Sequence, residues 1–237
     1  VDIYQFHNPA VCPKPGDGSG LYEAMLEAKE QGKIRFIGIT NHRMSIADEA
    51  IESGLYDTLQ FPFNYLSTER EIALAKACAE HEMGFIAMKG LSGGLLTNSA
   101  AIYAYMAQFE NVLPIWGVQK ESELDEFLSY IGNPPELTDE LKAVIEKDQK
   151  ELAGEFCRGC GYCMPCPAGI EINNCARMSL LLRRSPSAKH LSPEGQAKMK
   201  KIEDCLHCGH CKSMCPYGLD TPKLLEENYK DYKEVLA

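Results

Sequence analysis

Eight of the eleven cysteines fall into two closely spaced runs. The first run spans residues 157–167 and reads C-x₂-C-x₂-C-x₂-C-P, and the second spans residues 205–216 and reads C-x₂-C-x₂-C-x₃-C-P. Thiols at these spacings suit metal binding, because three of them can reach one centre from a short loop. The candidate ligands are Cys157, Cys160, Cys163, Cys166, Cys205, Cys208, Cys211 and Cys215.

The spacing is typical of proteins that carry two [4Fe–4S] clusters. In this pattern three cysteines of a run bind irons of one cluster, and the fourth, which precedes a proline, binds the other cluster. The rule predicts that Cys215 completes the site of the first run and that Cys166 completes the site of the second. The first run is one residue shorter than the usual bacterial form.

Zinc is the alternative metal, since paired C-x₂-C groups also form tetrahedral four-cysteine sites. Zinc sites do not need three closely spaced cysteines followed by Cys-Pro, so we favour the clusters. Cys175 lies close to the first run and is either a substitute ligand or a free buried thiol. Cys12 and Cys78 are expected to be spectators.

The segments around the two runs have helical patterns. Residues 178–184 and 193–204 lie between the runs, and residues 221–236 follow the second run with apolar side chains at packing positions. These patterns favour a mainly α-helical dicluster domain over the compact β-rich ferredoxin. We expect this domain to span residues 156–237 and a connecting helix, after a Pro-Pro turn, to span residues 137–155.

The first 136 residues alternate between strand and helix patterns. Helical patterns such as 21–28 and 71–78 place apolar residues at three- and four-residue steps, and glycines 32, 54 and 84 are expected to end helices. This alternation indicates an α/β fold with a parallel sheet, open or closed into a barrel. The predicted strands are 2–6, 34–39, 58–61, 84–88 and 113–118.

Details of this region resemble the aldo-keto reductase family from its fourth strand onward. Asp2–Pro9 resembles strand four, Lys33–Asn41 strand five and Gln60–Asn64 strand six. Gly84–Leu95 resembles strand seven with its glycine-bearing loop, and Pro114–Gly117, followed by a helical pattern, resembles strand eight. The resemblance implies that residues 1–136 are the C-terminal part of a (β/α)₈ TIM barrel.

The resemblance also implies roles for residues at the carboxyl ends of the strands, where barrel enzymes build their active sites. His7 would orient or polarise a substrate carbonyl, or is a structural histidine. Thr40, Asn41 and Gln60 match positions that hold the nicotinamide amide, although turn chemistry explains Thr40-Asn41 nearly as well. The remaining candidate cofactor contacts are Met88, Leu91, Gly93, Gly94, Gly117, Lys120 and Glu123.

Two of these positions depart from the residues that the family commonly carries. Met88 stands where many members stack an aromatic ring on nicotinamide, and Glu123 stands where NADPH-preferring members carry an arginine. A glutamate would repel a 2′-phosphate, with Lys120 in partial compensation, so NAD(H) is favoured over NADP(H). Gly93 and Gly94 would let the backbone approach a pyrophosphate, or form a plain flexible turn.

The first three strands of the family supply a catalytic tyrosine, lysine and aspartate and have no counterpart in this sequence. Five strands are too few to close a TIM barrel, and an open sheet would expose two long edges. We therefore expect a longer chain, or another polypeptide, to provide the N-terminal half of the barrel.

Together the two parts resemble the iron–sulfur subgroup of the aldo-keto reductases. This implies an oxidoreductase that moves electrons between NAD(P)H or a flavin and a small carbonyl or alcohol substrate, with the clusters as relay. Hydride carries two electrons and a cluster accepts one, so their exchange calls for an intermediary such as a flavin, of which the sequence has no signature. The alternative is a non-catalytic electron-transfer subunit that uses the barrel as a docking scaffold. Both hypotheses allow an external ferredoxin or another redox partner.

Composition narrows the class of protein further. The formal net charge is −10 without a basic stripe, which argues against a nucleic-acid partner. No apolar run approaches the roughly 18 residues that span a bilayer, and the first residues lack a signal-peptide pattern. Cysteines of metal-binding type suit a reducing compartment, so we expect a cytoplasmic protein without membrane contact. Oxygen-labile clusters would suit an anaerobic host.

Overall fold

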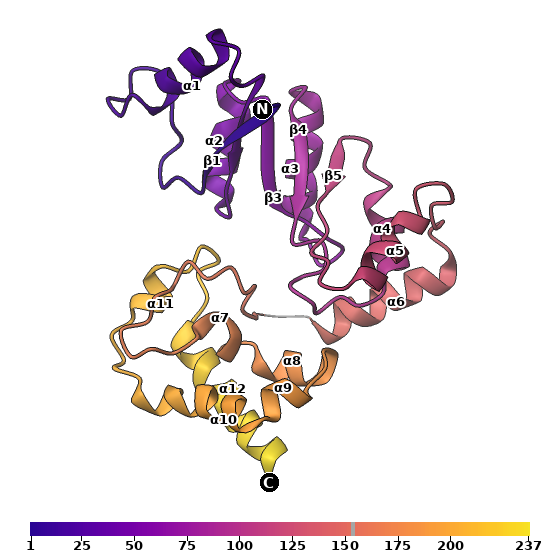
Figure 1. Cartoon of the computed structure of the whole chain (residues 1–237), viewed down its shortest axis with the longest axis vertical. Coiled ribbons are helices and arrows are strands. Elements are labelled where there is room, and N and C mark those ends of the chain that lie inside the picture. The colour runs from indigo at the N-terminus through magenta and orange to yellow at the C-terminus, as the bar shows by residue number, and fades with distance from the viewer. Residues whose placement is uncertain (153–154) are drawn as a thin grey trace. The chain divides into compact units, whose positions relative to one another are not determined.

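The computed structural model describes residues 1–152 and 155–237. The described chain divides into two compact units, one built around a sheet and the other helical (Figure 1). The connecting helix expected over residues 137–155 corresponds to α6, Asp139–Glu151. Residues 153 and 154 of the expected range lie outside the described residues. The first unit comprises residues 1–90 and 99–145, and the second comprises residues 91–98 and 146–237.

The first unit is built on a five-stranded parallel sheet whose strands follow chain order. Strands and helices alternate, which confirms the predicted α/β class (Figure 1). The strands are β1 (Ile3–His7), β2 (Phe36–Thr40), β3 (Thr58–Pro62), β4 (Gly84–Met88) and β5 (Val112–Pro114). The helices are α1 (Leu21–Glu30), α2 (Met44–Ser53), α3 (Glu69–Glu80), α4 (Ser99–Met106) and α5 (Glu121–Ser129).

The middle strands carry the core of this unit. Ile39, Leu59 and Phe61 are buried because helices cover the sheet, as a parallel sheet requires. The expected strand 113–118 is shorter in the structure, since its ladder with β4 ends at Pro114. Gly84 does not end a helix but begins β4, and the left-handed residue after α3 is Glu82 at φ 53°.

The second unit is held together by its last helix. Helix α12 packs against α7, α8 and α10, and its Leu225 and Tyr232 side chains are buried. The buried Asn228 side chain accepts from Ser179 N at 2.8 Å and donates to Ala176 O at 3.2 Å, which joins α12 to the α7–α8 corner. The helices are α7 (Ile172–Cys175), α8 (Met178–Arg184), α9 (Ala188–Leu191), α10 (Pro193–Lys200), the 3₁₀ helix η1 (Lys201–Asp204), α11 (His210–Ser213) and α12 (Thr221–Leu236).

The expected helices 178–184 and 221–236 coincide with α8 and α12, and 193–204 is divided into α10 and η1. Within residues 1–152 and 155–237, every helix is too short or too polar to cross a membrane.

Candidate functional site

The eight cysteines of the two runs line two hollows in the second unit. Each hollow takes three thiols from one run and the fourth from the other run. Site 1 is lined by Cys157, Cys160, Cys163 and Cys215. Site 2 is lined by Cys205, Cys208, Cys211 and Cys166.

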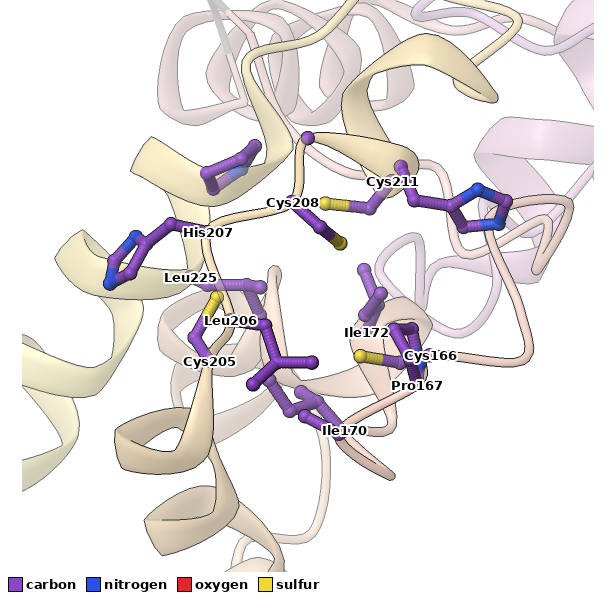
Figure 2. Close-up of a pocket in the computed structure, with 14 residues that line it drawn as sticks. Cys166, Pro167, Ile170, Ile172, Cys205, Leu206, His207, Cys208, Cys211 and Leu225 are labelled. Carbon is purple, nitrogen blue, oxygen red and sulfur yellow. The ribbon is translucent and has the colours of Figure 1, made fainter.

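Site 2 is an apolar hollow with thiols around it. Figure 2 shows the thiols of Cys166, Cys208 and Cys211 directed toward one space, with Cys205 beside it. His207 and Gly209 take the left-handed conformation, with φ of 49° and 72°, and so turn the backbone around this space. The hollow measures about 380 Å³ with its open mouth included, and its apolar walls include Ile170, Ile172, Leu206 and Leu225.

Site 1 is formed by the tight loop of the first run and the turn after Cys215. Gly159 and Gly161 lie between its cysteines at φ 65° and 84°, a conformation that glycine adopts without strain. The Gly159 N–H donates to the sulfur of Cys157 at 3.4 Å. The hollow measures about 310 Å³ with its open mouth included.

Burial makes three of the motif thiols, Cys157, Cys163 and Cys211, reluctant to ionise without a metal. It raises the pKa of Cys163 to about 12, with further contributions from the neighbouring Cys157 and Cys160 thiols. Burial also raises the pKa of Cys157 and of Cys211. A bound metal centre reverses this preference, because its positive charge deprotonates thiols that coordinate it.

The two sites are neighbours within the second unit. Cys163 of site 1 and Cys166 of site 2 are only three residues apart in the chain, and Cys211 of site 2 and Cys215 of site 1 are only four apart. Centres bound at the two sites would therefore be adjacent.

The arrangement of the thiols separates the two candidate metals. Within residues 1–152 and 155–237, no group of three or more His, Cys, Asp or Glu side chains is placed to hold a single metal ion. Four thiols around a hollow leave room for a centre larger than one ion. These residues therefore fit a multi-iron cluster better than tetrahedral zinc.

The other three cysteines line neither hollow. Cys175 is buried in α7, its sulfur lies 3.9 Å from Lys198 O, and burial raises its pKa to about 12. Cys12 contacts the Tyr56 hydroxyl at 3.4 Å, and Cys78 is buried in α3.

The candidate barrel residues His7, Thr40 and Gln60 lie at one level of the sheet. The register pairs His7 with Thr40 and Thr40 with Gln60, at the carboxyl ends of three adjacent strands. The Gln60 amide also reaches the sulfur of Met88, with Nε2 and Sδ 3.7 Å apart. Carboxyl ends of parallel strands are where barrel enzymes place their active sites.

Two of the candidate side chains are engaged in local structure. The Asn41 oxygen accepts from the backbone N–H groups of His42 and Arg43, both at 2.9 Å, and its Nδ2 donates to Pro9 O. Glu123 folds back on the start of α5, where its carboxylate accepts from Gln119 N at 2.7 Å. Asn41 thus performs the turn chemistry given as the alternative to nicotinamide binding.

The remaining candidates are divided between the units. Gly117 and Lys120 are exposed in the first unit, before α5. Leu91, Gly93 and Gly94 belong to the second unit, in the segment 91–98.

Comparison with known proteins matches both parts of the chain. The 4Fe-4S dicluster domain model matches residues 156–220. The model of the Aldo/keto reductase family matches residues 1–126, which is more than half of the chain. This chain belongs to the aldo/keto reductase family. Its membership and the dicluster domain confirm the resemblance that the sequence predicts.

Among individual proteins, this aldo/keto reductase chain is similar in fold to an aldo-keto reductase from Bacillus halodurans. The TM-score is 0.51 at 18% identity for both the apo and the holo form, over 62% of this chain. The match covers 62% of the apo chain and 60% of the holo chain, so this chain spans less than two thirds of these structures.

A curated relative matches over part of its length. It is the "Probable glycolate oxidase iron-sulfur subunit" of Bacillus subtilis (strain 168), 28% identical over 98 residues. The match covers 35% of the aldo/keto reductase chain and 22% of that relative.

Arg177 is a site residue that the sequence reasoning missed. It lies two residues after Cys175, and its guanidinium lies against Gly159 of site 1, where an added Cβ would be 2.7 Å from Cζ. Its Nη1 donates to Gly93 O at 3.4 Å, within the second unit. The available signal was a charged residue between two apolar ones, Ala176 and Met178, both of which are buried. Its position in the sequence does not show that it lies beside the loop of Cys157, 20 residues earlier.

Proposed function

We propose that this member of the aldo/keto reductase family is an iron–sulfur oxidoreductase that carries two [4Fe–4S] clusters as an electron relay. The observation that carries the proposal is the grouping of eight thiols into two sets of four, each completed by a cysteine of the other run. The dicluster domain match over residues 156–220 supports the same conclusion.

The thiols and the apolar side chains of the two hollows would have different roles in binding a cluster. Thiolates are the ligands that iron–sulfur clusters require, and the apolar walls at site 2 limit access of water to the centre. When bound, each cluster would supply one-electron transfer. The nearness of the two sites supports exchange of electrons between the two centres.

In the barrel part we propose a site for a small carbonyl or alcohol substrate and for NAD(H), NADP(H) or a flavin. The row of His7, Thr40 and Gln60 at the carboxyl ends of adjacent strands supports this placement. His7 would orient the substrate oxygen, and the Gln60 amide would hold a cofactor amide. A flavin meets the requirement for an intermediary between two-electron and one-electron carriers.

Further strands from a longer chain or a partner are proposed to complete this barrel. β1 and β5 each pair with one strand among the described residues, and they expose large apolar side chains, 56% of Tyr4 and 62% of Leu113. Apolar edges of this kind favour pairing with another strand.

A second candidate function is an electron-transfer subunit within a larger complex. The relative from Bacillus subtilis, whose name calls it an iron-sulfur subunit, favours this alternative. In that case the chemistry would belong to a partner, and a ferredoxin or another redox protein would exchange electrons with the clusters.

The first test is iron and acid-labile sulfide analysis of anaerobically purified protein, followed by EPR spectroscopy after reduction. We expect about eight irons per chain and interacting signals from two reduced clusters. Zinc in place of iron, or about four irons, would contradict the two-cluster proposal.

Titration with NADH and with free flavin then separates the two candidate functions. Reduction of the clusters by NADH in the presence of flavin supports the enzyme. Absence of nicotinamide and flavin binding, with clusters that still accept electrons from a reduced ferredoxin, supports the electron-transfer subunit.

A further inference from the structure

Arg177 occupies a narrow space between two backbone segments of the second unit. On one side it lies against Gly159, where an added Cβ would be 2.7 Å from Cζ, and on the other against Gly93, where an added Cβ would be 2.6 Å from Nη1. A Cβ at either position would require the guanidinium to move. The two glycines therefore admit the guanidinium, and Gly93 O accepts a hydrogen bond from it.

The guanidinium is placed without a carboxylate partner in the described part of the chain. Its Nε is buried without a hydrogen-bond partner there, and none of the ion pairs formed by residues 1–152 and 155–237 includes Arg177. The two other arginines on the same stretch differ, since Arg183 pairs with Asp231 at 2.6 Å and Arg184 with Asp148 at 2.8 Å. Arg177 is half-buried with its Nε fully covered, and a partly buried cation is favoured by a negative group nearby.

The negative group that the arrangement offers is the ligand set of site 1. Gly159 lies between Cys157 and Cys160, so the guanidinium contacts the loop that holds these two thiols. Four thiolates and their cluster would carry a net negative charge, which grows by one on reduction.

We propose that Arg177 is the counter-ion of the cluster at site 1 and raises the reduction potential of that cluster above its value without the cation. The inference rests on the proposed function, because it requires a cluster at site 1. Arg177 is a positioning residue that acts through charge. A cation beside a redox centre stabilises the reduced, more negative form, and the partial burial of Arg177 reduces screening of this effect by salt.

The segment 91–98 has a part in this arrangement. Gly93 presents its carbonyl to Arg177 and takes φ 66°, and Arg184 donates to Leu95 O at 3.0 Å. Two arginines thus hold the loop that follows β4 against the α8 region of its own unit. A side chain at position 93 would displace the guanidinium, so the loop conformation is linked to the electrostatics of site 1.

The test is redox titration of the full chain, monitored by EPR, with iron and sulfide analysis of every sample. Arg177→Gln removes the charge, Arg177→Lys keeps it, and Arg183→Gln is the matched control on the same helical stretch. We expect Arg177→Gln to lower one of the two potentials by about 59 mV, which is about a tenfold fall in the equilibrium constant for one-electron reduction. The Lys variant and the Arg183 control are expected to stay within about threefold of the wild type.

Gly93→Ala provides a second measurement in case Arg177→Gln loses iron. It keeps the charge but moves the guanidinium, so we expect the same potential to fall by a smaller amount. Unchanged potentials in iron-replete Arg177→Gln, equal shifts of both potentials, or an equal shift in Arg183→Gln would overturn the role of Arg177 while leaving the two clusters in place. Wild-type protein without about eight irons would instead overturn the proposed function, and this inference with it.

Discussion

Replacement of Cys215 by alanine is expected to remove the cluster of site 1, although Cys215 belongs to the second run. Its side chain lines the hollow formed by the first run, and the other three cysteines of its own run line the other hollow. The variant leaves three thiols at site 1 and all four at site 2. Iron should therefore fall from about eight to about four per chain.

Double variants give a result that does not depend on whether a site with three cysteines still binds a cluster. Cys157→Ala with Cys215→Ala removes two ligands of one site, so the iron content should stay near four per chain. Cys205→Ala with Cys215→Ala removes one ligand from each site, so the iron content should approach zero. Cys175→Ala is the control, because this buried thiol lines neither hollow and its loss should leave about eight irons.

Iron and sulfide content, measured on anaerobic protein together with the EPR spectrum of the reduced state, decides between the two arrangements. Without crossing, the pattern of the double variants would be inverted: the Cys157 and Cys215 pair would lose both clusters, and the Cys205 and Cys215 pair would keep one. That inverted result would refute the assignment of Cys215 to site 1.

Three further perturbations test packing and electrostatics. Arg184→Leu breaks the ion pair with Asp148, whose two side chains are only 13% and 12% exposed. In denaturant titrations it should lower the free energy of unfolding by about 3 kcal/mol. The exposed Arg183→Gln should lower it by less than about 1 kcal/mol. Gly38→Ala places a Cβ 2.3 Å from the Thr58 hydroxyl oxygen and should lower the free energy of unfolding by about 1–3 kcal/mol in the same assay. Gly132 has open space around it, so Gly132→Ala should leave that free energy nearly unchanged. His42 is buried, and burial lowers its pKa from 6.5 to about 4. The contribution of the neutral imidazole to the free energy of unfolding is therefore fully present above pH 6.5. The free energy of unfolding should fall by about 3 kcal/mol as the pH drops from 6.5 to about 4. His42→Gln should remove most of that dependence in melting curves, and an unchanged pH profile would refute this account.

Several expectations from the sequence failed at the ends of elements. Periodicity located β5 but extended it to residue 118, while its pairing with β4 ends at Pro114. Gly84 was expected to end a helix because glycine favours that position, yet Glu82 takes the left-handed conformation there. Hydrogen bonding and packing, which depend on neighbours distant in sequence, determine where a ladder or a helix ends.

The candidate barrel residues illustrate a second limit. The resemblance identified Asn41 and Glu123 by position, but only their hydrogen bonds show that Asn41 closes a turn and that Glu123 caps α5. Gly93 was predicted either to let the backbone approach a pyrophosphate or to form a plain turn, and only the structure shows that the guanidinium of Arg177 lies beside it. Whether a polar group is available for a ligand depends on its other partners, which spacing does not reveal.

The sequence by itself determined the alternating α/β order, the membership in the aldo/keto reductase family and the presence of a dicluster domain. The α/β order is encoded in the period of apolar residues, the dicluster domain in thiol spacings set by the reach of a short loop, and the family in the resemblance of the strand motifs. Spacing predicted the crossed grouping of the thiols, but only the tertiary structure placed Cys215 beside the first run and Arg177 beside site 1. Those are relations between residues up to 58 positions apart, such as Cys157 and Cys215, and they arise when α12 packs the second run against the first part of its unit.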